Sequence, residues 1–236
     1  MRVYRPRIPT GQHTNNSSTR SRLAWCRQYA VRSYRGSVER SIRKFKQQAI
    51  PQEVILDLVN LAAQSPSASN SQPWRFLIVV NREVIEAMHR AVAQEQQKIL
   101  AALSGVEREN FAEYSCYFLH FIGAPTVIVP IYKPIEILSH YLSGTALQDA
   151  HGIQYMEHLS GVVSISLAIE NLLLSAHEKG LGASCMSGPL IANTALREIL
   201  SVPARWQIAL LIPLGYPDES PEPKPRKGAE QIVKWI

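Results

Sequence analysis

The sequence predicts one folded, soluble domain that combines helices with buried strands and is preceded by a basic arm. Three short runs of nearly uninterrupted apolar residues have the length and composition of buried strands. Between these runs, apolar residues recur at the spacing of amphipathic or buried helices. At 236 residues, of which 46% are hydrophobic, the chain is long enough to bury a core of its own.

The basic residues are concentrated near the amino terminus. The chain has 25 Lys and Arg against 19 Asp and Glu, but residues 1–45 hold 11 of the basic residues and one acid, Glu39. A block of like charge is more often a solvated arm than a binding surface, so we predict that residues 1–36 are a disordered arm and that no nucleic acid is bound. The Arg-rich, acid-free composition also fits an organelle-targeting peptide, and a misplaced start site is a third interpretation.

The cysteine content predicts a cytoplasmic protein. The chain has three widely spaced cysteines, Cys26, Cys116 and Cys185. An odd count without a C-x-x-C pair argues against a disulfide framework and against a zinc site, and fits a reducing compartment. No uninterrupted apolar run reaches 18 residues, and His140, His151 and His158 fit no metal spacing, so neither a membrane span nor a metal is expected.

The first half of the domain predicts a helix, a strand and two more helices. Pro51 suits the first turn of a helix, because the N–H that proline lacks has no partner there, and an apolar stripe follows it. Residues 76–80 are continuously apolar and are predicted as a buried strand. Residues 82–103 and 107–121 are predicted as helices.

The second half predicts two further strands around an irregular segment and a long helix. Residues 125–132 and 206–214 are the strands, and residues 193–200 are a short helix. Residues 133–156 show no steady period and are rich in aromatic residues and His. A long irregular segment inside a compact domain is often a lid or binding loop, so substrate choice should lie here.

The helix predicted over residues 159–177 points to a second subunit. It is apolar around nearly its whole circumference, which is typical of a helix buried on all sides. A domain of this size rarely hides a helix of about five turns completely, so we infer that a second copy covers part of it. The proline-rich stretch Glu219–Arg226 and the apolar end Ile232–Ile236 also need a surface to pack on, which a neighbouring subunit would provide.

Two polar motifs are candidates for ligand binding in the first half of the domain. The first is Arg40-Ser41-Ile42-Arg43-Lys44-Phe45, whose guanidinium groups can bind a phosphate in bidentate fashion, although such a cluster is more commonly a solvated helix end. The second is the loop Pro66-Ser67-Ala68-Ser69-Asn70-Ser71-Gln72-Pro73-Trp74. The amides of Asn70 and Gln72 match the donors and acceptors of a flat heterocycle, and a plain helix-to-strand connection is the alternative.

Two more motifs follow in the second half. Gly180-Leu181-Gly182 ends the long helix and leads through small residues to Ser187-Gly188, where backbone N–H groups are accessible to a ligand ring. Near the end, Gly215-Tyr216-Pro217 precedes the basic stretch Lys224-Pro225-Arg226-Lys227. A tight connection is an equally good local interpretation of the third motif.

Taken in this order, the four motifs resemble those of the FMN-dependent nitroreductase family. The resemblance covers residues 37–236. It implies an α+β fold with a mixed, mainly antiparallel central sheet wrapped by helices. It also implies an obligate homodimer with FMN at the interface and with C-terminal arms exchanged between subunits. The chain has no G-x-G-x-x-G fingerprint, and none is expected, since this family binds nicotinamide transiently over the flavin.

The resemblance also assigns roles to individual residues. The FMN phosphate and ribityl chain would be held by the first motif and the C-terminal arm, through Arg40, Ser41, Arg43, Lys44 and Arg226, with Ile42 in the same element. The ring edge or ribityl hydroxyls would be bound by the loop, through Asn70 and Gln72, with Ser67 and Ser69 near the ring. The backbone N–H groups of Ser187 and Gly188 would face flavin N5.

The implied activity is a two-step, ping-pong oxidoreduction. NADH or NADPH delivers hydride to the flavin, and a nitroaromatic or quinone then takes its place and is reduced. No catalytic acid or base is required. The family also includes enzymes that oxidise peptide-derived rings, remove halogens or fragment flavin, and no residue decides among them. A biosynthetic dehydrogenase that passes electrons to oxygen and a non-catalytic flavin-binding or regulatory protein are the alternatives.

Overall fold

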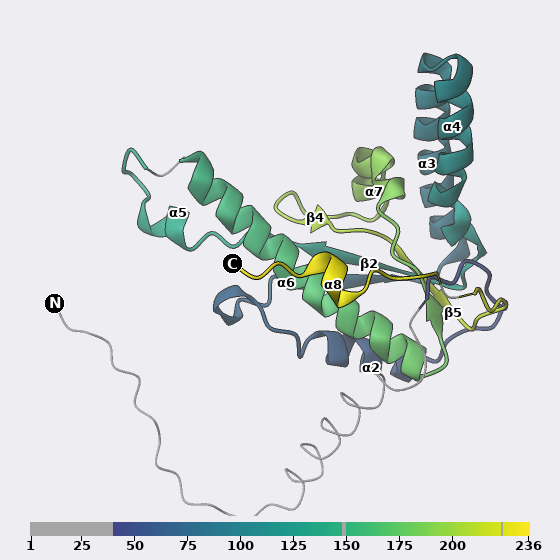
Figure 1. Ribbon diagram of the computed structural model, residues 1–236, viewed down its shortest axis with the longest axis horizontal. Helices are drawn as coiled ribbons and strands as arrows, with labels where there is room; N and C mark the ends of the chain where they lie inside the picture. The colour runs from purple at the N-terminus through teal and green to yellow at the C-terminus, as the bar shows by residue number, and fades with distance from the viewer. Residues whose placement is uncertain (1–39, 148–149, 223) are drawn as a thin grey trace, which may run out of the picture. The chain divides into compact units, whose positions relative to one another are not determined.

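The computed structural model describes residues 40–147, 150–222 and 224–236 (Figure 1). The predicted basic arm, residues 1–36, lies outside these ranges. The helices are α2 (Gln52–Ala62), α3 (Arg82–Ala102), α4 (Gly105–Ser115), α5 (Leu138–Tyr141), α6 (His151–Glu178), α7 (Asn193–Ile199) and α8 (Ala229–Ile232). The strands are β1 (Trp74–Val79), β2 (Thr126–Tyr132), β3 (Gly182–Ala183), β4 (Gln207–Ile208) and β5 (Ile212–Gly215). Short 3-10 turns are η2 (Ala68–Asn70), η3 (Cys116–Phe118), η4 (His120–Gly123) and η5 (Gly188–Ala192).

The strands form one sheet in the order β1-β2-β5-β3, with β4 also paired to β2. All of the strand pairs are antiparallel. β2 is buried at every position, as its continuous apolar sequence predicts for a strand covered on both faces. The predicted α+β fold with a mainly antiparallel central sheet and surrounding helices is therefore confirmed.

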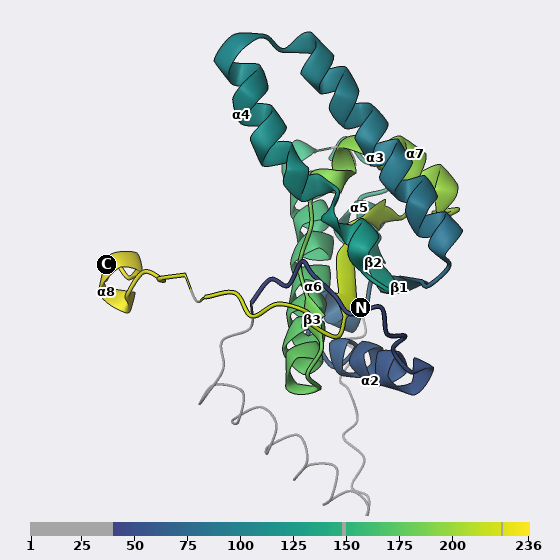
Figure 2. The same cartoon turned by 90° about the vertical axis from the view of Figure 1, so that its right-hand side faces the viewer.

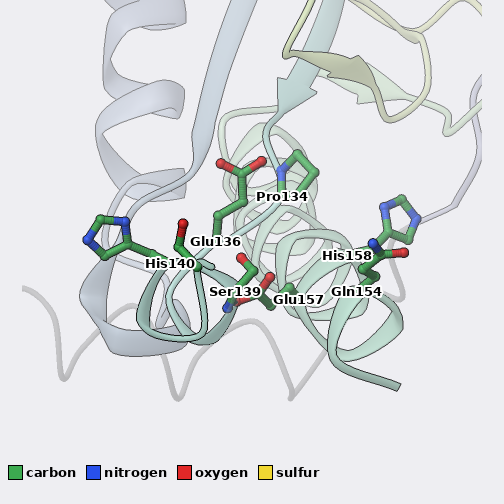
Figure 3. A pocket seen from close by; sticks show the side chains of 8 residues that line it. Pro134, Glu136, Ser139, His140, Gln154, Glu157 and His158 are labelled. Atoms are coloured by element: carbon green, nitrogen blue, oxygen red, sulfur yellow. Dashed lines mark hydrogen bonds between the residues drawn. The ribbon is translucent and has the colours of Figure 1, made fainter. Parts of the chain in front are cut away.

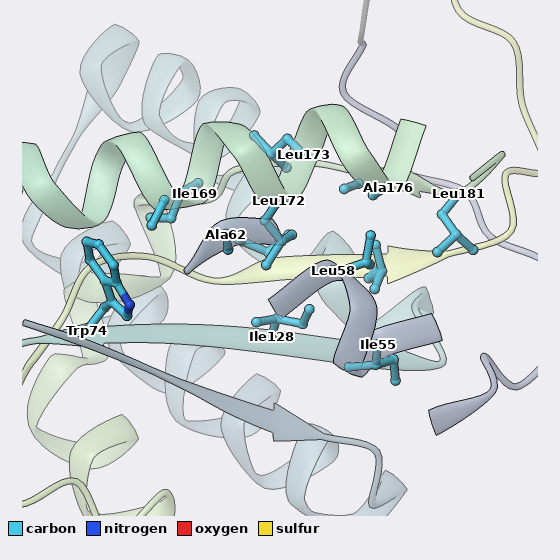
Figure 4. Packing of buried hydrophobic residues seen from close by; sticks show 14 of the residues in the cluster. Ile55, Leu58, Ala62, Trp74, Ile128, Ile169, Leu172, Leu173, Ala176 and Leu181 are labelled. Atoms are coloured by element: carbon cyan, nitrogen blue, oxygen red, sulfur yellow. The ribbon is translucent and has the colours of Figure 1, made fainter. Parts of the chain in front are cut away.

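Alternate residues of β2 point into two separate cores, because successive side chains of a strand face opposite sides of the sheet. Ile128 packs with α2 and α6 on one face. Val127, Val129 and Ile131 pack with α3 and α7 on the other face. Figure 4 shows the first core, in which Leu58 of α2 and Leu172 of α6 are fully buried.

α6 begins at His151, earlier than the predicted start at residue 159. Its first turns carry no apolar stripe because they stand away from the core, and Glu157 is the only buried residue between 151 and 158. The predicted irregular segment, residues 133–156, is therefore shorter and contains the single-turn helix α5. By length and hydropathy alone α6 could cross a membrane, yet a buried core helix passes the same test.

α6 is not buried on all sides within one chain. Leu159, Val163 and Leu167 are 42%, 49% and 43% exposed, in line with one another at four-residue intervals. The opposite side of the helix packs in the core through residues such as Ile165 and Leu172. The exposed stripe is the part of the helix for which the sequence predicts a second subunit.

Two predicted elements are interrupted in the structure. The strand predicted over residues 206–214 is divided into β4 and β5, because Leu211 exchanges backbone hydrogen bonds with Met186 at 2.9 and 3.0 Å instead of continuing along β2. The helix predicted over residues 107–121 ends at Ser115 and continues as the 3-10 turns η3 and η4.

The carboxyl-terminal arm is extended and ends in exposed apolar residues. In Figure 2, α8 stands away from the sheet and the other helices. Ile232 is 68% exposed and Trp235 is 92% exposed. Large apolar side chains gain most when they leave water, so this end of the chain is suited to a protein surface.

Candidate functional site

Three of the four predicted motifs meet at one end of the sheet. The backbone N–H of Ile42 donates to the carbonyl of Ala183 in β3 at 2.8 Å, and Ser41 forms a parallel bridge with the same residue. On the other side, Lys46 N–H donates to the Tyr216 carbonyl at 2.9 Å. The basic element, residues 40–45, therefore lies between the small-residue loop, residues 180–188, and the start of the carboxyl-terminal arm.

Glycines make this close approach possible. A Cβ on Gly182 would lie 2.7 Å from the side chain of Ile42, and a Cβ on Gly215 would lie 2.9 Å from Phe45. Both distances are shorter than van der Waals contact, so neither position has room for a side chain. Ile42 and Phe45 are themselves buried, which turns the polar residues between and beside them toward the surface.

Arg40 carries a buried donor without an acceptor. Its Nη1 donates to the carbonyl of Pro221 at 2.7 Å, while its buried Nε has no hydrogen-bond partner among the described residues. An unpaired buried donor costs free energy of about 1–3 kcal/mol, and more for a charged group. Buried donors without an acceptor are rare in native proteins, and this one could donate to an anionic ligand.

The backbone of the basic element also binds a carboxylate. Glu219 Oε1 accepts from the N–H groups of Arg43 at 2.5 Å and Lys44 at 3.1 Å. The Arg43 guanidinium lies over the Tyr117 ring, 5.5 Å from its centroid. Arg226 is exposed on the arm, and none of the hydrogen bonds among the described residues joins it to this cluster.

The predicted flavin loop adopts a strained and specific conformation. Ser69, Asn70 and Gln72 have φ angles of 53°, 50° and 45°, a region that residues other than glycine rarely occupy. Ser67 Oγ accepts from the backbone N–H of Gln72 at 3.0 Å. The side-chain Nε2 of Gln72 donates to Asn70 Oδ1 at 3.5 Å. Strain of this kind is concentrated at binding sites.

The flavin loop does not meet the other three motifs within one chain. Ala68 N–H donates to Ser164 Oγ, in the middle of α6, at 3.3 Å. Glu178, the last residue of α6 before the loop to β3, is about 20 Å farther along the helix axis at 1.5 Å per residue. Figure 4 shows this separation, with Trp74 and Leu181 at opposite ends of the core.

The flavin loop instead borders an apolar cavity on α6. The cavity has a volume of about 400 Å³ and is lined by Pro66, Ser67, Ala68, Met156, Leu159, Ser160, Val163, Ser164 and Leu167. Its α6 side includes the exposed stripe described above. The loop and the stripe therefore form one continuous surface. Trp74 packs in the core beneath the loop.

His120 fixes the start of the small-residue loop. Its Nδ1 lies 2.8 Å from the Tyr117 carbonyl and its Nε2 lies 3.0 Å from Ser184 Oγ. Because a carbonyl can only accept, we assign the proton to Nδ1, and the buried Ser184 hydroxyl then donates to Nε2. Burial lowers the pKa of His120, the hydrogen bond to Tyr117 raises it and the charge of Arg43 lowers it. Together these effects place the pKa below its ordinary value of 6.5.

The pH dependence of stability should change in the variant His120→Gln. A lowered pKa means that His120 stabilises the fold fully above pH 6.5 and progressively less as the pH falls below that value. The wild type should therefore lose more unfolding free energy than His120→Gln between pH 7.5 and 5.5 in urea denaturation. The exposed His151→Gln is the control. Parallel pH profiles for wild type and His120→Gln would contradict the assignment.

Gly188, at the end of the same loop, lies against an aromatic ring. A Cβ on Gly188 would be only 2.1 Å from the Phe118 ring. Phe118 is buried and makes edge contacts with Phe111 and Tyr114. The predicted N–H donors of Ser187 and Gly188 are therefore backed by aromatic side chains of η3 and α4.

The predicted lid, residues 133–156, surrounds a polar cavity of about 460 Å³ (Figure 3). Its lining residues are Pro134, Glu136, Ser139, His140, Ser143, Gln154, Glu157 and His158. The buried Glu157 Oε1 accepts from the N–H groups of Leu138 at 2.6 Å and Ser139 at 3.0 Å. Burial would raise the pKa of Glu157, but hydrogen bonds from Ser139, Leu138 and Ile137 together lower it below 4.5.

Glu157→Gln should loosen the lid. The substitution removes charge from two backbone hydrogen bonds, so we expect a loss of about 1–2 kcal/mol in unfolding free energy at pH 7. Because the pKa is lowered, the difference between wild type and variant should be present above pH 4.5 and shrink as the pH falls below it. Faster proteolysis within residues 136–147 would localise the effect. Glu170→Gln, an exposed change on the same helix, is the control.

Several residues of this site carry no local signal in the sequence. His120, Ser184 and Phe118 meet only through contacts between distant parts of the chain. Glu219 belongs to a stretch that predicts only an extended arm. In the sequence, only the glycine at position 188 indicates that another side chain, here Phe118, approaches the loop closely.

The comparison with protein families is consistent with this arrangement. A model of the nitroreductase family matches residues 39–216. The chain belongs to the nitroreductase family. The resemblance inferred from the four ordered motifs is thereby confirmed.

The proteins that this chain is similar to include a nitroreductase, a BluB-like flavoprotein and an iodotyrosine deiodinase. The chain is 28% identical over 188 residues to "Putative NAD(P)H nitroreductase YfhC" of Bacillus subtilis, covering 79% of this chain and 84% of that protein. A BluB-like flavoprotein of Clostridium difficile has the same fold at 24% identity, with a TM-score of 0.72 over 84% and 95% of the two chains. An iodotyrosine deiodinase bound to FMN and 3-iodo-L-tyrosine gives 23% identity and a TM-score of 0.63 over 84% and 95%.

Proposed function

We propose that this nitroreductase-family protein is a homodimeric, FMN-dependent oxidoreductase that takes hydride from NAD(P)H and passes it to nitroaromatic or quinone acceptors by a ping-pong mechanism. The observation that carries the proposal is the buried Nε of Arg40, which has no partner among the described residues and lies where three motifs meet. The Bacillus subtilis relative, which is named as an NAD(P)H nitroreductase, and the FMN in the deiodinase structure support the choice of cofactors.

The residues around Arg40 fit a phosphate group. Arg40 Nε needs an acceptor, Ser41 is exposed beside it, and the Arg43 and Lys44 side chains are exposed without an ion-pair partner in the described structure. Phosphate oxygens accept charge-assisted hydrogen bonds from such donors. Arg226 would reach the same phosphate once the arm is placed by a second subunit.

A second copy would complete the site. The flavin loop lies too far along α6 to share a ligand with Arg40 of its own chain, and it adjoins the exposed stripe of Leu159, Val163 and Leu167. Pairing two copies through this stripe by twofold symmetry would bring Asn70 and Gln72 of one to the basic element of the other.

The carboxyl-terminal arm has a matching surface. β1 is at the end of the sheet order, and beside it lies a cavity of about 650 Å³. Its apolar lining includes Ile50, Leu56, Ile78 and Val80. An exchanged arm that ends in Ile232–Ile236 would cover this surface of the partner.

FMN, when bound, supplies the hydride-accepting and hydride-donating chemistry. The chain supplies position and polarity. The N–H groups of Ser187 and Gly188, fixed by His120 and Phe118, would donate to the ring, while Asn70 and Gln72 would orient it. Preorganised donors stabilise charge that develops during reduction without having to reorient. A catalytic acid or base is not part of the proposal, and we place the activity in the cytoplasm.

An absorbance spectrum followed by NADH and NADPH titration tests the proposal. A yellow protein that is bleached by either nucleotide, and whose colour returns on adding a quinone, is the expected result. Bleaching by an organic substrate alone, with reoxidation by air, would point to a dehydrogenase that uses oxygen. A colourless protein that binds no added FMN would refute the proposal.

The subunit arrangement has its own test. Val163→Glu places a charge in the middle of the exposed stripe and should shift the protein from dimer to monomer in light scattering, with loss of FMN. The matched control is Val106→Glu, which changes a residue 65% exposed on α4 and should leave the dimer intact. A dimer that tolerates Val163→Glu would exclude this interface.

A further inference from the structure

A row of three side chains crosses the sheet just beyond the flavin loop. Arg75 on β1 is a diagonal neighbour of Lys133 on the extension of β2, because Trp74 pairs with Tyr132 and Arg75 with Ile131. The pairing of Tyr132 with Gln207 places Trp206 beside Lys133 on the other side. Diagonal and directly opposite neighbours share one face of a sheet, so the three side chains stand together.

The two cations share the Trp206 ring. Arg75 Cζ lies 4.4 Å from the ring centroid, and Lys133 Nζ lies 6.0 Å from it. The two charges are therefore within about 10 Å of each other, close enough for mutual repulsion. The indole ring offsets part of this repulsion through cation–π attraction and holds Arg75 in place.

The described residues give neither cation an acidic partner. The four ion pairs found within residues 40–147, 150–222 and 224–236 involve other side chains. Glu136, the nearest acid along the chain, is already paired with Arg205. Two converging cations without a carboxylate form a ready site for an anion with several oxygen acceptors.

This cluster is adjacent to the flavin loop. Lys133 N–H donates to the carbonyl of Pro73, the last loop residue before β1, at 3.0 Å. On its other side, Lys133 is followed by Pro134, which lines the polar cavity of about 460 Å³ in the lid. By alternation along the strands, Arg75 and Lys133 share the sheet face of Ile131, at the edge where the flavin loop joins β1.

We propose that Arg75 and Lys133 bind the 2′-phosphate of NADPH and give the protein a preference for NADPH over NADH. This inference rests on the proposed function, since it assumes that a nicotinamide nucleotide is the electron donor. The two nucleotides differ only in this phosphomonoester, which carries close to two negative charges at neutral pH. Trp206 has a positioning role: it orients the guanidinium and does not itself touch the phosphate.

Calorimetry with nucleotide fragments tests the phosphate site without requiring turnover. On the purified full chain, adenosine 2′,5′-bisphosphate should bind at least about tenfold more tightly than adenosine 5′-monophosphate. Arg75→Gln combined with Lys133→Gln should remove this difference, whereas Arg90→Gln with Lys98→Gln, which removes two exposed cations on α3, should preserve it. Inorganic phosphate should compete with the bisphosphate in the millimolar range, as expected for an anion site.

Enzyme kinetics then tests the preference. The ratio of kcat/KM for NADPH to that for NADH should fall about tenfold in the Arg75→Gln, Lys133→Gln variant and stay unchanged in the control. Equal binding of the two fragments to the wild type, or an unchanged ratio in the variant, would overturn the inference while flavin reduction still upheld the proposed function. A bisphosphate site on a protein that carries no flavin would refute the proposed function and leave the phosphate site standing.

Discussion

Replacing Arg40 and Arg226 together by alanine should release FMN while leaving a folded dimer. Arg40 offers a buried donor that no other described residue pairs with, and Arg226 would return to the same phosphate from the arm. Each charge-assisted hydrogen bond to phosphate is worth about 1.5–3 kcal/mol, so the loss of two should weaken FMN binding at least about a hundredfold. The measurement is flavin retained after gel filtration, followed by titration of the apoprotein with FMN.

The control for this variant is the pair Arg90→Ala and Lys98→Ala, which removes the same number of charges from exposed positions on α3. It should keep its full flavin content, because surface ion pairs such as Lys98–Glu95 contribute little. Full FMN occupancy in the Arg40→Ala, Arg226→Ala protein would show that the phosphate lies elsewhere. Circular dichroism and light scattering would establish that any loss is not caused by unfolding or dissociation.

Gly188→Ala should have the second large effect. The added methyl group would lie 2.1 Å from the Phe118 ring, so the loop or the ring must move. Overpacking of this kind costs about 1–3 kcal/mol of unfolding free energy. Because the loop is predicted to donate to the flavin ring, its displacement should also slow flavin reduction by NAD(P)H in stopped-flow measurements.

A double variant separates the clash from other causes. Gly188→Ala combined with Phe118→Leu should recover part of the stability lost by Gly188→Ala alone, since residues in contact do not have additive effects. Gly123→Ala is the control, because a Cβ there meets nothing within 4 Å. If Gly188→Ala were as stable as the Gly123→Ala control, the close contact with Phe118 would not exist in solution.

Much of the fold follows from local patterns. β2 is buried at every position and nearly all apolar, and it was therefore predictable, as was the helix over residues 82–103. The start of α6 was not, because residues 151–158 lie outside the core and have no stripe to reveal them. The break between β4 and β5 depends on the bridge from Leu211 to Met186, a contact between distant residues that no local pattern encodes.

The candidate site shows the same division. The basic element from Arg40 to Lys44 could be selected from sequence by its clustered cations, and the loop from Ser67 to Gln72 by its polar residues between a helical pattern and an apolar run. The contact of His120 with Ser184 could not, since the two are separated by 64 positions. Glu219, which accepts from the backbone of the basic element, was likewise hidden in a stretch that indicates only an extended chain.

The length of α6 between the flavin loop and β3 has a genetic consequence. If each site combines the basic element of one chain with the loop of the other, a subunit carrying Arg40→Ala and a subunit carrying Asn70→Ala are defective in different halves. A heterodimer of the two would collect both defects in one site and leave the other site entirely wild type. Two inactive alleles could then complement each other in a mixed population, with at most half of the normal number of sites restored in each heterodimer.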